Sequence, residues 1–177
     1  MMNYINILIF IVSGITISLI SNQLLLKFSQ NLGIRNKNNV TIRWSNQSKP
    51  SLGGIGLFLG FLSALFIYQI IEPDLNLFSD LSFLGLFFAA SMAFFMGLAD
   101  DAYDTKPLFK LFIQISCGMF LLFTGTSIEL FHHETIDGVI TVIWVIILMN
   151  SLNMLDNMDG ITATTVLFIL LSCLVSA

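Results

Sequence analysis

The sequence predicts an all-α protein, a polytopic membrane helix bundle of about six transmembrane helices with an external N-terminus. Composition is the first reason: 56% of the 177 residues are hydrophobic and only 10% are charged, whereas a soluble globular domain has roughly 25% charged residues. The mean hydropathy of +0.89 agrees with this. The second reason is six windows without a charged residue, each close to the roughly 20 residues that cross the hydrocarbon core.

Each of the six windows is predicted to be a helix. Backbone groups in lipid must find partners within their own segment, and the windows are too long and too uniformly apolar for barrel strands. No repeat or linker interrupts them, so residues 1–177 are predicted to form a single transmembrane domain. In chain order the windows are Met1–Leu26, Pro50–Ile71, Leu81–Ala99, Leu111–Ile128, Gly138–Leu155 and Gly160–Ala177.

All seven basic residues fall in two connections of the same parity, the first and the third. The positive-inside rule places those connections, and with them the fifth, in the cytoplasm, and it places the N-terminus outside. The external connections contain acidic residues and histidines but no Lys or Arg, and His132 and His133 are interpreted as surface histidines rather than metal ligands. A net charge of −4 argues against a nucleic-acid partner, which needs Lys and Arg in excess.

Three carboxylates gather where the third window meets the cytoplasm: Asp100, Asp101 and Asp104. Residues three or four apart share a helix face, so these like charges repel one another unless a cation offsets them. Mg²⁺ takes carboxylate oxygens and keeps coordination positions for phosphate, so it is the predicted cofactor, with Mn²⁺ as the alternative. Solvated aspartates at a helix end are the simpler interpretation, but three that adjoin a hydrophobic span favour a function.

A second polar segment, with the sequence Asn-Ser-Leu-Asn-Met-Leu-Asp-Asn-Met-Asp-Gly, ends the fifth window and forms the fifth connection. On a helix, Asn150, Asn153 and Asn157 would form a stripe about 60° wide. Amides that enter a membrane span are costly unless they line a cavity or bind a ligand. Interhelical hydrogen bonding is the alternative for the asparagines, but it does not account for Asp156 and Asp159.

A third segment, Arg-Trp followed by Lys-Pro-Ser-Leu-Gly-Gly-Ile-Gly, opens the second window. Glycines at a helix N-terminus expose backbone N–H groups that can receive phosphate, and Lys49 adds positive charge. Gly56 and Gly60 also form a small-xxx-small face, so helix packing is an equally strong interpretation of the glycines.

The three segments together, in this order, resemble the polyprenyl-phosphate N-acetylhexosamine-1-phosphate transferases, from about Lys27 to Thr162. This membrane superfamily, glycosyltransferase family 4, includes the bacterial undecaprenyl-phosphate GlcNAc-1-phosphate transferases and the phospho-MurNAc-pentapeptide transferase. The resemblance implies transfer of a sugar 1-phosphate, GlcNAc-1-phosphate first among the candidates, from a UDP-sugar to undecaprenyl phosphate with release of UMP. Such a reaction would serve cell-wall or surface polysaccharide synthesis.

The resemblance also implies roles for single residues. Asp100 and Asp101 match the acidic pair that positions or deprotonates the lipid phosphate, and we group Asp104 with them as catalytic. Asp101 and Asp156 are the expected metal ligands. Asn157 stands where many members have Gly, which leaves the identity of the sugar open. The expected substrate-binding residues are Lys49, Lys110, Asn153, Asn157 and Asp159.

The resemblance further implies a multi-pass protein of the plasma (inner) membrane with a cytoplasmic active site, and it leaves homodimer formation open. Family members continue with helices that carry a Gly-Asp motif and a His-containing cytoplasmic motif, so we expect a C-terminally truncated chain, the N-terminal part of a longer family domain. Two alternatives remain. One is an ion-coupled transporter, which predicts charges at mid-helix, and the other is an inactive fragment or scaffold that binds lipid phosphate.

Overall fold

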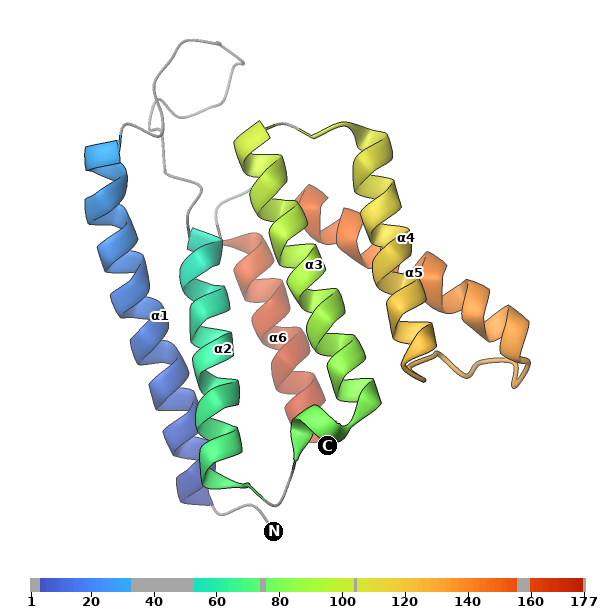
Figure 1. Cartoon of the computed structure of the whole chain (residues 1–177), viewed down its shortest axis with the longest axis horizontal. Coiled ribbons are helices and arrows are strands. Elements are labelled where there is room, and N and C mark those ends of the chain that lie inside the picture. Colours follow the sequence, from blue (N-terminus) through green and yellow to red (C-terminus); the bar gives the residue numbers. More distant parts are fainter. Residues whose placement is uncertain (1–3, 33–52, 74–75, 104, 156–159, 177) are drawn as a thin grey trace. The chain divides into compact units, whose positions relative to one another are not determined.

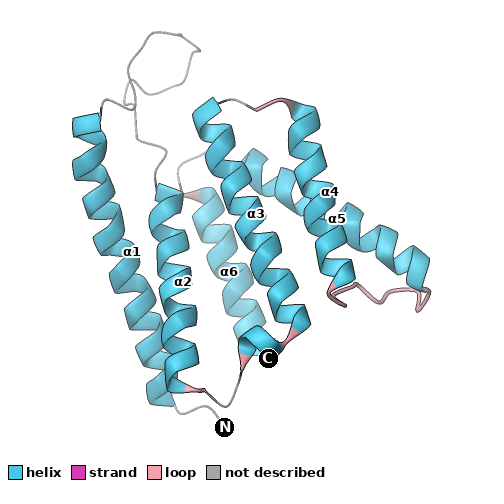
Figure 2. Ribbon diagram, viewed as in Figure 1, coloured by secondary structure: helices cyan, strands magenta, loops and turns pink. Residues whose placement is uncertain are grey.

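The computed structural model describes residues 4–32, 53–73, 76–103, 105–155 and 160–176. Within these ranges the chain is helical and has no strand (Figure 2), so the all-α prediction is confirmed. Each predicted window corresponds to one α-helix. The elements are α1 (Tyr4–Leu32), α2 (Gly53–Ile71), the short 3₁₀-helix η1 (Leu77–Ser79), α3 (Leu81–Tyr103), α4 (Pro107–Phe123), α5 (Glu134–Leu155) and α6 (Ile161–Ser176).

In the described part of the chain, four helices are long and apolar enough to cross a membrane, judged by length and composition. They are α2, α3, α5 and, within α1, residues Asn6–Phe28. The apolar helices α4 and α6 have 17 and 16 residues, somewhat fewer than the roughly 20 that span the hydrocarbon core. The helices form a polytopic membrane bundle, as predicted, with two shorter members.

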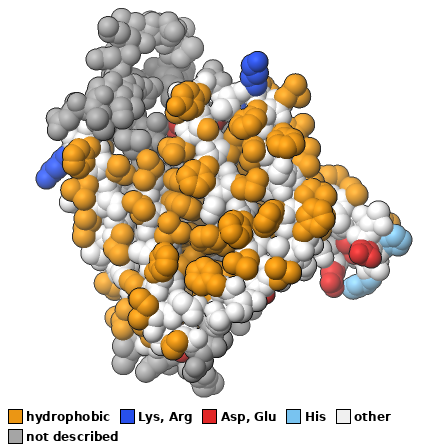
Figure 3. All heavy atoms as spheres, in the orientation of Figure 1, with side chains coloured by type: hydrophobic (Ala, Val, Ile, Leu, Met, Phe, Trp, Pro, Cys, Tyr) orange, Lys and Arg blue, Asp and Glu red, His pale blue; other side chains and the backbone are white. Residues whose placement is uncertain are grey.

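Large apolar side chains point outward along the helices. Ile70 in α2, Phe123 in α4 and Val175 in α6 are 77%, 77% and 88% exposed. Hydrophobic side chains cover much of the visible face, on which charged ones are few (Figure 3). Among the described residues, the buried hydrophobic ones are Ala89 and Cys117. Such a surface is suited to lipid rather than water, and close helix contacts are left to small residues.

The fourth helix differs most from its predicted window. The apolar run covers residues 111–128, but α4 begins at Pro107 and ends at Phe123. Proline suits the first helical position, where its missing N–H has no helical partner to lose. At the other end, Gly125 has a φ of +83°, and its N–H and that of the next residue donate to carbonyls of the last turn at 3.0 and 2.9 Å. This is a Schellman cap, which ends a helix even where the following residues are apolar.

Two basic residues that the windows left in connections are helical. Lys27 lies in α1 and Lys110 lies in the first turn of α4. A lysine can keep its ammonium group in water while its stem lies along apolar surface, so a helix can continue past the charge-free window. The predicted orientation depends on the membrane side of these residues, not on their secondary structure, and stays a prediction.

The residues fall into two compact units. The first contains residues 1–80 and 94–104, and the second contains residues 81–93 and 105–177. In the first unit, α1 and α2 lie side by side (Figure 1). In the second unit, α4 packs on α5, and α5 also contacts α6. That both units belong to a single transmembrane domain stays a prediction.

Small residues bring α1 and α2 together in the first unit. A Cβ added at Gly60 would lie 2.8 Å from the carbonyl oxygen of Gly14 and 2.9 Å from Ser18 Cβ, so only glycine fits there. Gly56 packs in the same way against the side chain of Asn22. Both glycines are buried. The packing interpretation of the small-xxx-small face is therefore confirmed.

Candidate functional site

Helices α4 and α5 approach each other closely in the second unit. Gly118 makes this possible, because a Cβ added there would lie 2.9 Å from Val142 Cα and 3.2 Å from Val142 Cγ2. One turn further along α4, Leu122 Cδ1 lies 3.5 Å from where a Cβ on Gly138 would be. Since the residue numbers of the contacts rise along α4 while they fall along α5, the two helices run antiparallel.

One turn toward the beginning of α4, a pair of amides replaces the close contact. Asn150 Nδ2 donates to Gln114 Oε1 at 3.0 Å and to the carbonyl oxygen of Ile146 at 2.9 Å. Gln114 is 6% exposed. Because a buried amide without a partner costs free energy, each side chain satisfies part of the other's requirement. The interhelical hydrogen-bond interpretation is confirmed for Asn150.

The same register leads to two candidate substrate-binding residues. Lys110 lies four residues before Gln114, and Asn153 lies three residues after Asn150. Residues three or four apart share a helix face, so each candidate continues the face that carries the interhelical hydrogen bond. Lys110 is half-buried and Asn153 is exposed. The structure therefore brings these two candidates to the same end of the α4–α5 pair.

The described part of the acidic cluster lies in the last turn of α3. Asp100 is half-buried and Asp101 is exposed. Since α3 ends at Tyr103 and α4 begins at Pro107, only a short connection separates this acidic pair from Lys110 along the chain. In the described part of the chain, no group of three or more His, Cys, Asp or Glu side chains is arranged to hold a metal ion. Within the acidic cluster, the described side chains that could offer oxygen ligands to a metal ion are therefore the neighbouring carboxylates of Asp100 and Asp101.

Five predicted site residues lie outside the described ranges, and their catalytic, substrate-binding and metal-binding roles stay predictions. They are Lys49, Asp104, Asp156, Asn157 and Asp159.

One buried carboxylate was assigned by the sequence to an external connection. Asp137 lies in the first turn of α5, because that helix begins at Glu134 rather than at Gly138. It is 4% exposed, and its carboxylate accepts three hydrogen bonds, at 2.9 to 3.2 Å, from backbone N–H groups of residues 130–133. An acidic residue in the first turn of a helix is a sequence signal for this kind of interaction. The sequence does not predict which backbone N–H groups donate to the carboxylate.

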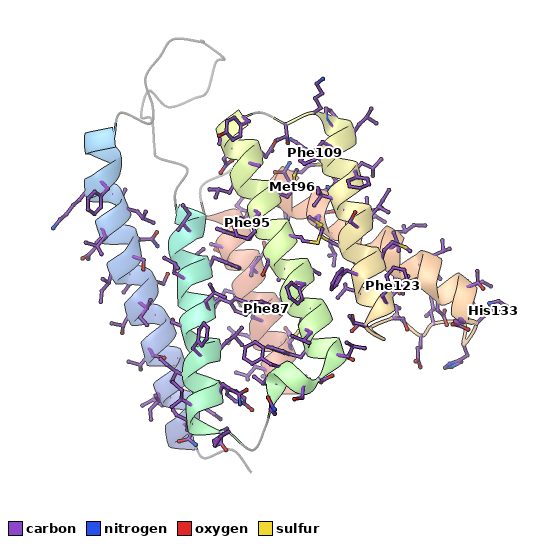
Figure 4. The ribbon with its side chains drawn as sticks, viewed as in Figure 1. Phe87, Phe95, Met96, Phe109, Phe123 and His133 are labelled. Atoms are coloured by element: carbon purple, nitrogen blue, oxygen red, sulfur yellow. The ribbon has the colours of Figure 1, made fainter. Side chains whose placement is uncertain are left out.

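A pocket of about 1100 Å³ lies at the same end of α4 and α5 as Asp137. Apolar side chains of both helices line it together with Glu129, His132 and Glu134. Acidic and histidine side chains gather there, at the right edge of Figure 3, and Figure 4 labels Phe123 and His133 at the two ends of the connection. Both histidines are exposed, as predicted. The described candidates for the transferase site do not line this pocket.

Comparisons with known proteins agree with the family resemblance, and the family match includes the aspartate segment and the asparagine segment. The profile of Glycosyl transferase family 4 matches residues 83–177, from the first turn of α3 through α6. A similar curated protein is the probable undecaprenyl-phosphate N-acetylglucosaminyl 1-phosphate transferase of Bacillus subtilis (strain 168), which is 21% identical over 123 residues, covering 64% of this chain and 32% of the relative. The chain thus spans about a third of that relative's length. No solved structure matches significantly. Because the family profile matches more than half of its residues, the chain belongs to glycosyl transferase family 4.

Proposed function

We propose that this chain forms part of a membrane enzyme that transfers a sugar 1-phosphate from a UDP-sugar to a polyprenyl phosphate. GlcNAc-1-phosphate and undecaprenyl phosphate are the proposed group and acceptor, in cell-wall or surface polysaccharide synthesis. Membership of the family and the name of the Bacillus relative support this class of reaction. The observation that carries the proposal is the antiparallel α4–α5 pair, which brings Lys110 and Asn153 to the same end of these two helices.

In the proposed reaction, a phosphate oxygen of the lipid attacks the β-phosphorus of the UDP-sugar. A bond forms between that oxygen and the β-phosphorus, the bond from the β-phosphorus to the bridging oxygen breaks, and UMP leaves with the bridging oxygen. Charge spreads over the phosphoryl oxygens in the transition state, so positioning and charge neutralisation supply most of the catalysis. Lys110 would neutralise the diphosphate, and the amide of Asn153 would hold the nucleotide part.

The acidic pair fits a Mg²⁺ site of the kind that substrate phosphates complete. Mg²⁺ is commonly bound through one or two carboxylates plus phosphate oxygens, and Asp101 is exposed at the helix end where a phosphate can reach it. Asp101 and Asp156 would hold the ion, with Mn²⁺ as the alternative. When bound, the metal neutralises phosphate charge. Asp100 would orient the lipid phosphate or take its proton, with Asp104 as the third catalytic candidate.

The proposed location is the plasma (inner) membrane with the site on the cytoplasmic face, as the distribution of basic residues indicates. The ion-coupled transporter is the weaker alternative, because a relay through the bilayer needs charges near mid-helix. Among the described residues, the acidic ones within α-helices occur in terminal turns of α3 and α5. Homodimer formation stays open, and nucleic acid is not a proposed partner.

The decisive test is transfer of radiolabelled sugar phosphate from UDP-GlcNAc to undecaprenyl phosphate in detergent, using the longest form of the chain that its gene encodes. We expect transfer that depends on Mg²⁺, stops on chelation and is lost in Asp101→Asn. The matched control is Asp80→Asn, the same change in an exposed residue just before α3, which should keep wild-type activity. Absence of transfer with several UDP-sugars, while the protein still binds polyprenyl phosphate, would favour the scaffold interpretation.

A further inference from the structure

The amide pair between α4 and α5 has a defined orientation. The carbonyl of Ile146 can only accept a hydrogen bond, so the Asn150 atom 2.9 Å from it is Nδ2. The same nitrogen donates its second hydrogen to Gln114 Oε1 at 3.0 Å. Both N–H groups of Asn150 are thus engaged within the protein, one by its own helix and one by α4. The side chain of Asn150 is held from two directions.

Packing alone does not explain a glutamine at this position. Leucine or methionine has a similar volume, and the neighbouring contacts of this interface, Gly118 with Val142 and Leu122 with Gly138, use no polar side chain. The amide pair differs from an apolar contact because it selects one register, since a slip of the helices leaves the buried side chain of Gln114 without its hydrogen bond from Asn150. What Gln114 adds is therefore a fixed register of α4 against α5.

We propose that Gln114 is a positioning residue of the transferase site, which holds Asn150 and thereby sets how Lys110 and Asn153 face the substrate. This inference rests on the proposed function. Lys110 lies one helical turn from Gln114, and Asn153 lies one turn from Asn150. Gln114 contacts no reacting atom in this proposal, and its effect reaches the substrate through these two neighbours.

The kinetic test uses Gln114→Leu in the full-length enzyme. Misplacement of a site by a fraction of an ångström to 1 Å lowers turnover, so we expect kcat to fall roughly 10- to 100-fold while KM for the UDP-sugar changes little. Gln23→Leu, the same change at an exposed residue of α1, should keep the wild-type kcat. Gln114→Asn should also lose kcat, because its side chain is one methylene shorter, and adding Asn150→Gln should restore most of it.

A second readout measures geometry without activity. Spin labels on Leu111→Cys and Met154→Cys report the spacing of the α4–α5 end, in a background with Cys117→Ala and Cys173→Ser. We expect a narrow distance distribution that broadens or shifts in Gln114→Leu.

The two readouts separate the possible outcomes. Broadening together with a loss of kcat supports the proposal. An unchanged distance distribution overturns it, whether kcat is kept or lost, because Gln114 then has no positioning effect or acts on the substrate directly. Broadening with no transfer even in the wild type would overturn the transferase assignment instead and leave a purely structural contact.

Discussion

Replacing Gly118 by alanine tests how closely α4 and α5 are held. The added Cβ would lie 2.9 Å from Val142 Cα and 3.3 Å from Val142 Cβ, whereas non-bonded carbon atoms are most stable at about 3.5–4.0 Å. Because the nearest obstacle is backbone, rotation of a side chain cannot relieve it, and α5 must move by about 1 Å. Overpacking of this kind costs about 1–3 kcal/mol, and the higher helix propensity of alanine offsets up to about 1 kcal/mol.

The matched control is Gly97→Ala in α3. Among the described residues, nothing lies within 4 Å of a Cβ added at Gly97, so this change gains the same helix propensity without overpacking. The difference between the two variants then isolates the overpacking, and we expect Gly118→Ala to be less stable by about 1–3 kcal/mol. The measurement is the free energy of unfolding in mixed detergent micelles, followed by circular dichroism during an SDS titration.

Equal stability of the two variants would refute the close approach of α4 and α5 at Gly118. A second consequence sharpens the test. Because Gly118 and Gln114 belong to the same interface, Gly118→Ala should also broaden the distance distribution between labels at 111 and 154, and Gly97→Ala should not. A destabilised variant with an unchanged distribution would mean that the strain is absorbed away from the candidate site.

Three further predictions concern other parts of the chain. Gly60→Ala should lower the free energy of unfolding by about 1–3 kcal/mol because α1 must move, whereas Gly53→Ala, which meets nothing within 4 Å among the described residues, should change it little; equal effects would contradict the α1–α2 packing. Asp137→Ala removes the acceptor of three backbone N–H groups, so hydrogen exchange of residues 130–133 should accelerate, and unchanged protection would show that the carboxylate does not hold the loop. Lys110→Met should lower kcat/KM for the UDP-sugar roughly 10- to 100-fold, as expected for the loss of a charge-assisted contact of about 1.5–3 kcal/mol, and an unaffected kcat/KM would exclude this lysine from the substrate site.

The helices were predictable because lipid constrains residue type strongly. A charged residue at the bilayer centre costs roughly 2.5–3.5 kcal/mol, so charge-free windows reveal the spans with little help from local propensity. The same argument could not locate the ends of α4. The capping geometry at Gly125 ends the helix although the following residues are still apolar. Hydropathy reports which side chains prefer lipid, whereas the end of a helix depends on backbone conformation and backbone hydrogen bonds.

The candidate site was only partly predictable, for a different physical reason. Lys110 adjoins one apolar window and Asn153 lies within another, and the family resemblance implies that both residues bind substrate. Which partner Asn150 would find was not predictable, because the pairing with Gln114 depends on the register of two helices. That register follows from the close contact at Gly118, a property of two backbones rather than of one sequence segment. Likewise, the partners of Asp137 are backbone N–H groups, which every residue except proline has.

The contacts of α4 with α5 change in character along one helix face, and this change explains how a membrane bundle can present charge without burying it. Gly118 contacts the α5 backbone, Gln114 shares a hydrogen bond one turn earlier, and Lys110 follows one turn before that, half-buried in the first turn of α4. Toward the beginning of α4, close packing is followed by a neutral polar pair and then by an ammonium group. The polarity of the side chains on this face therefore increases toward the helix end. A rotation of α4 by one residue would disturb these contacts together, which is why variants at Gly118 and at Gln114 should displace the same two substrate-facing side chains.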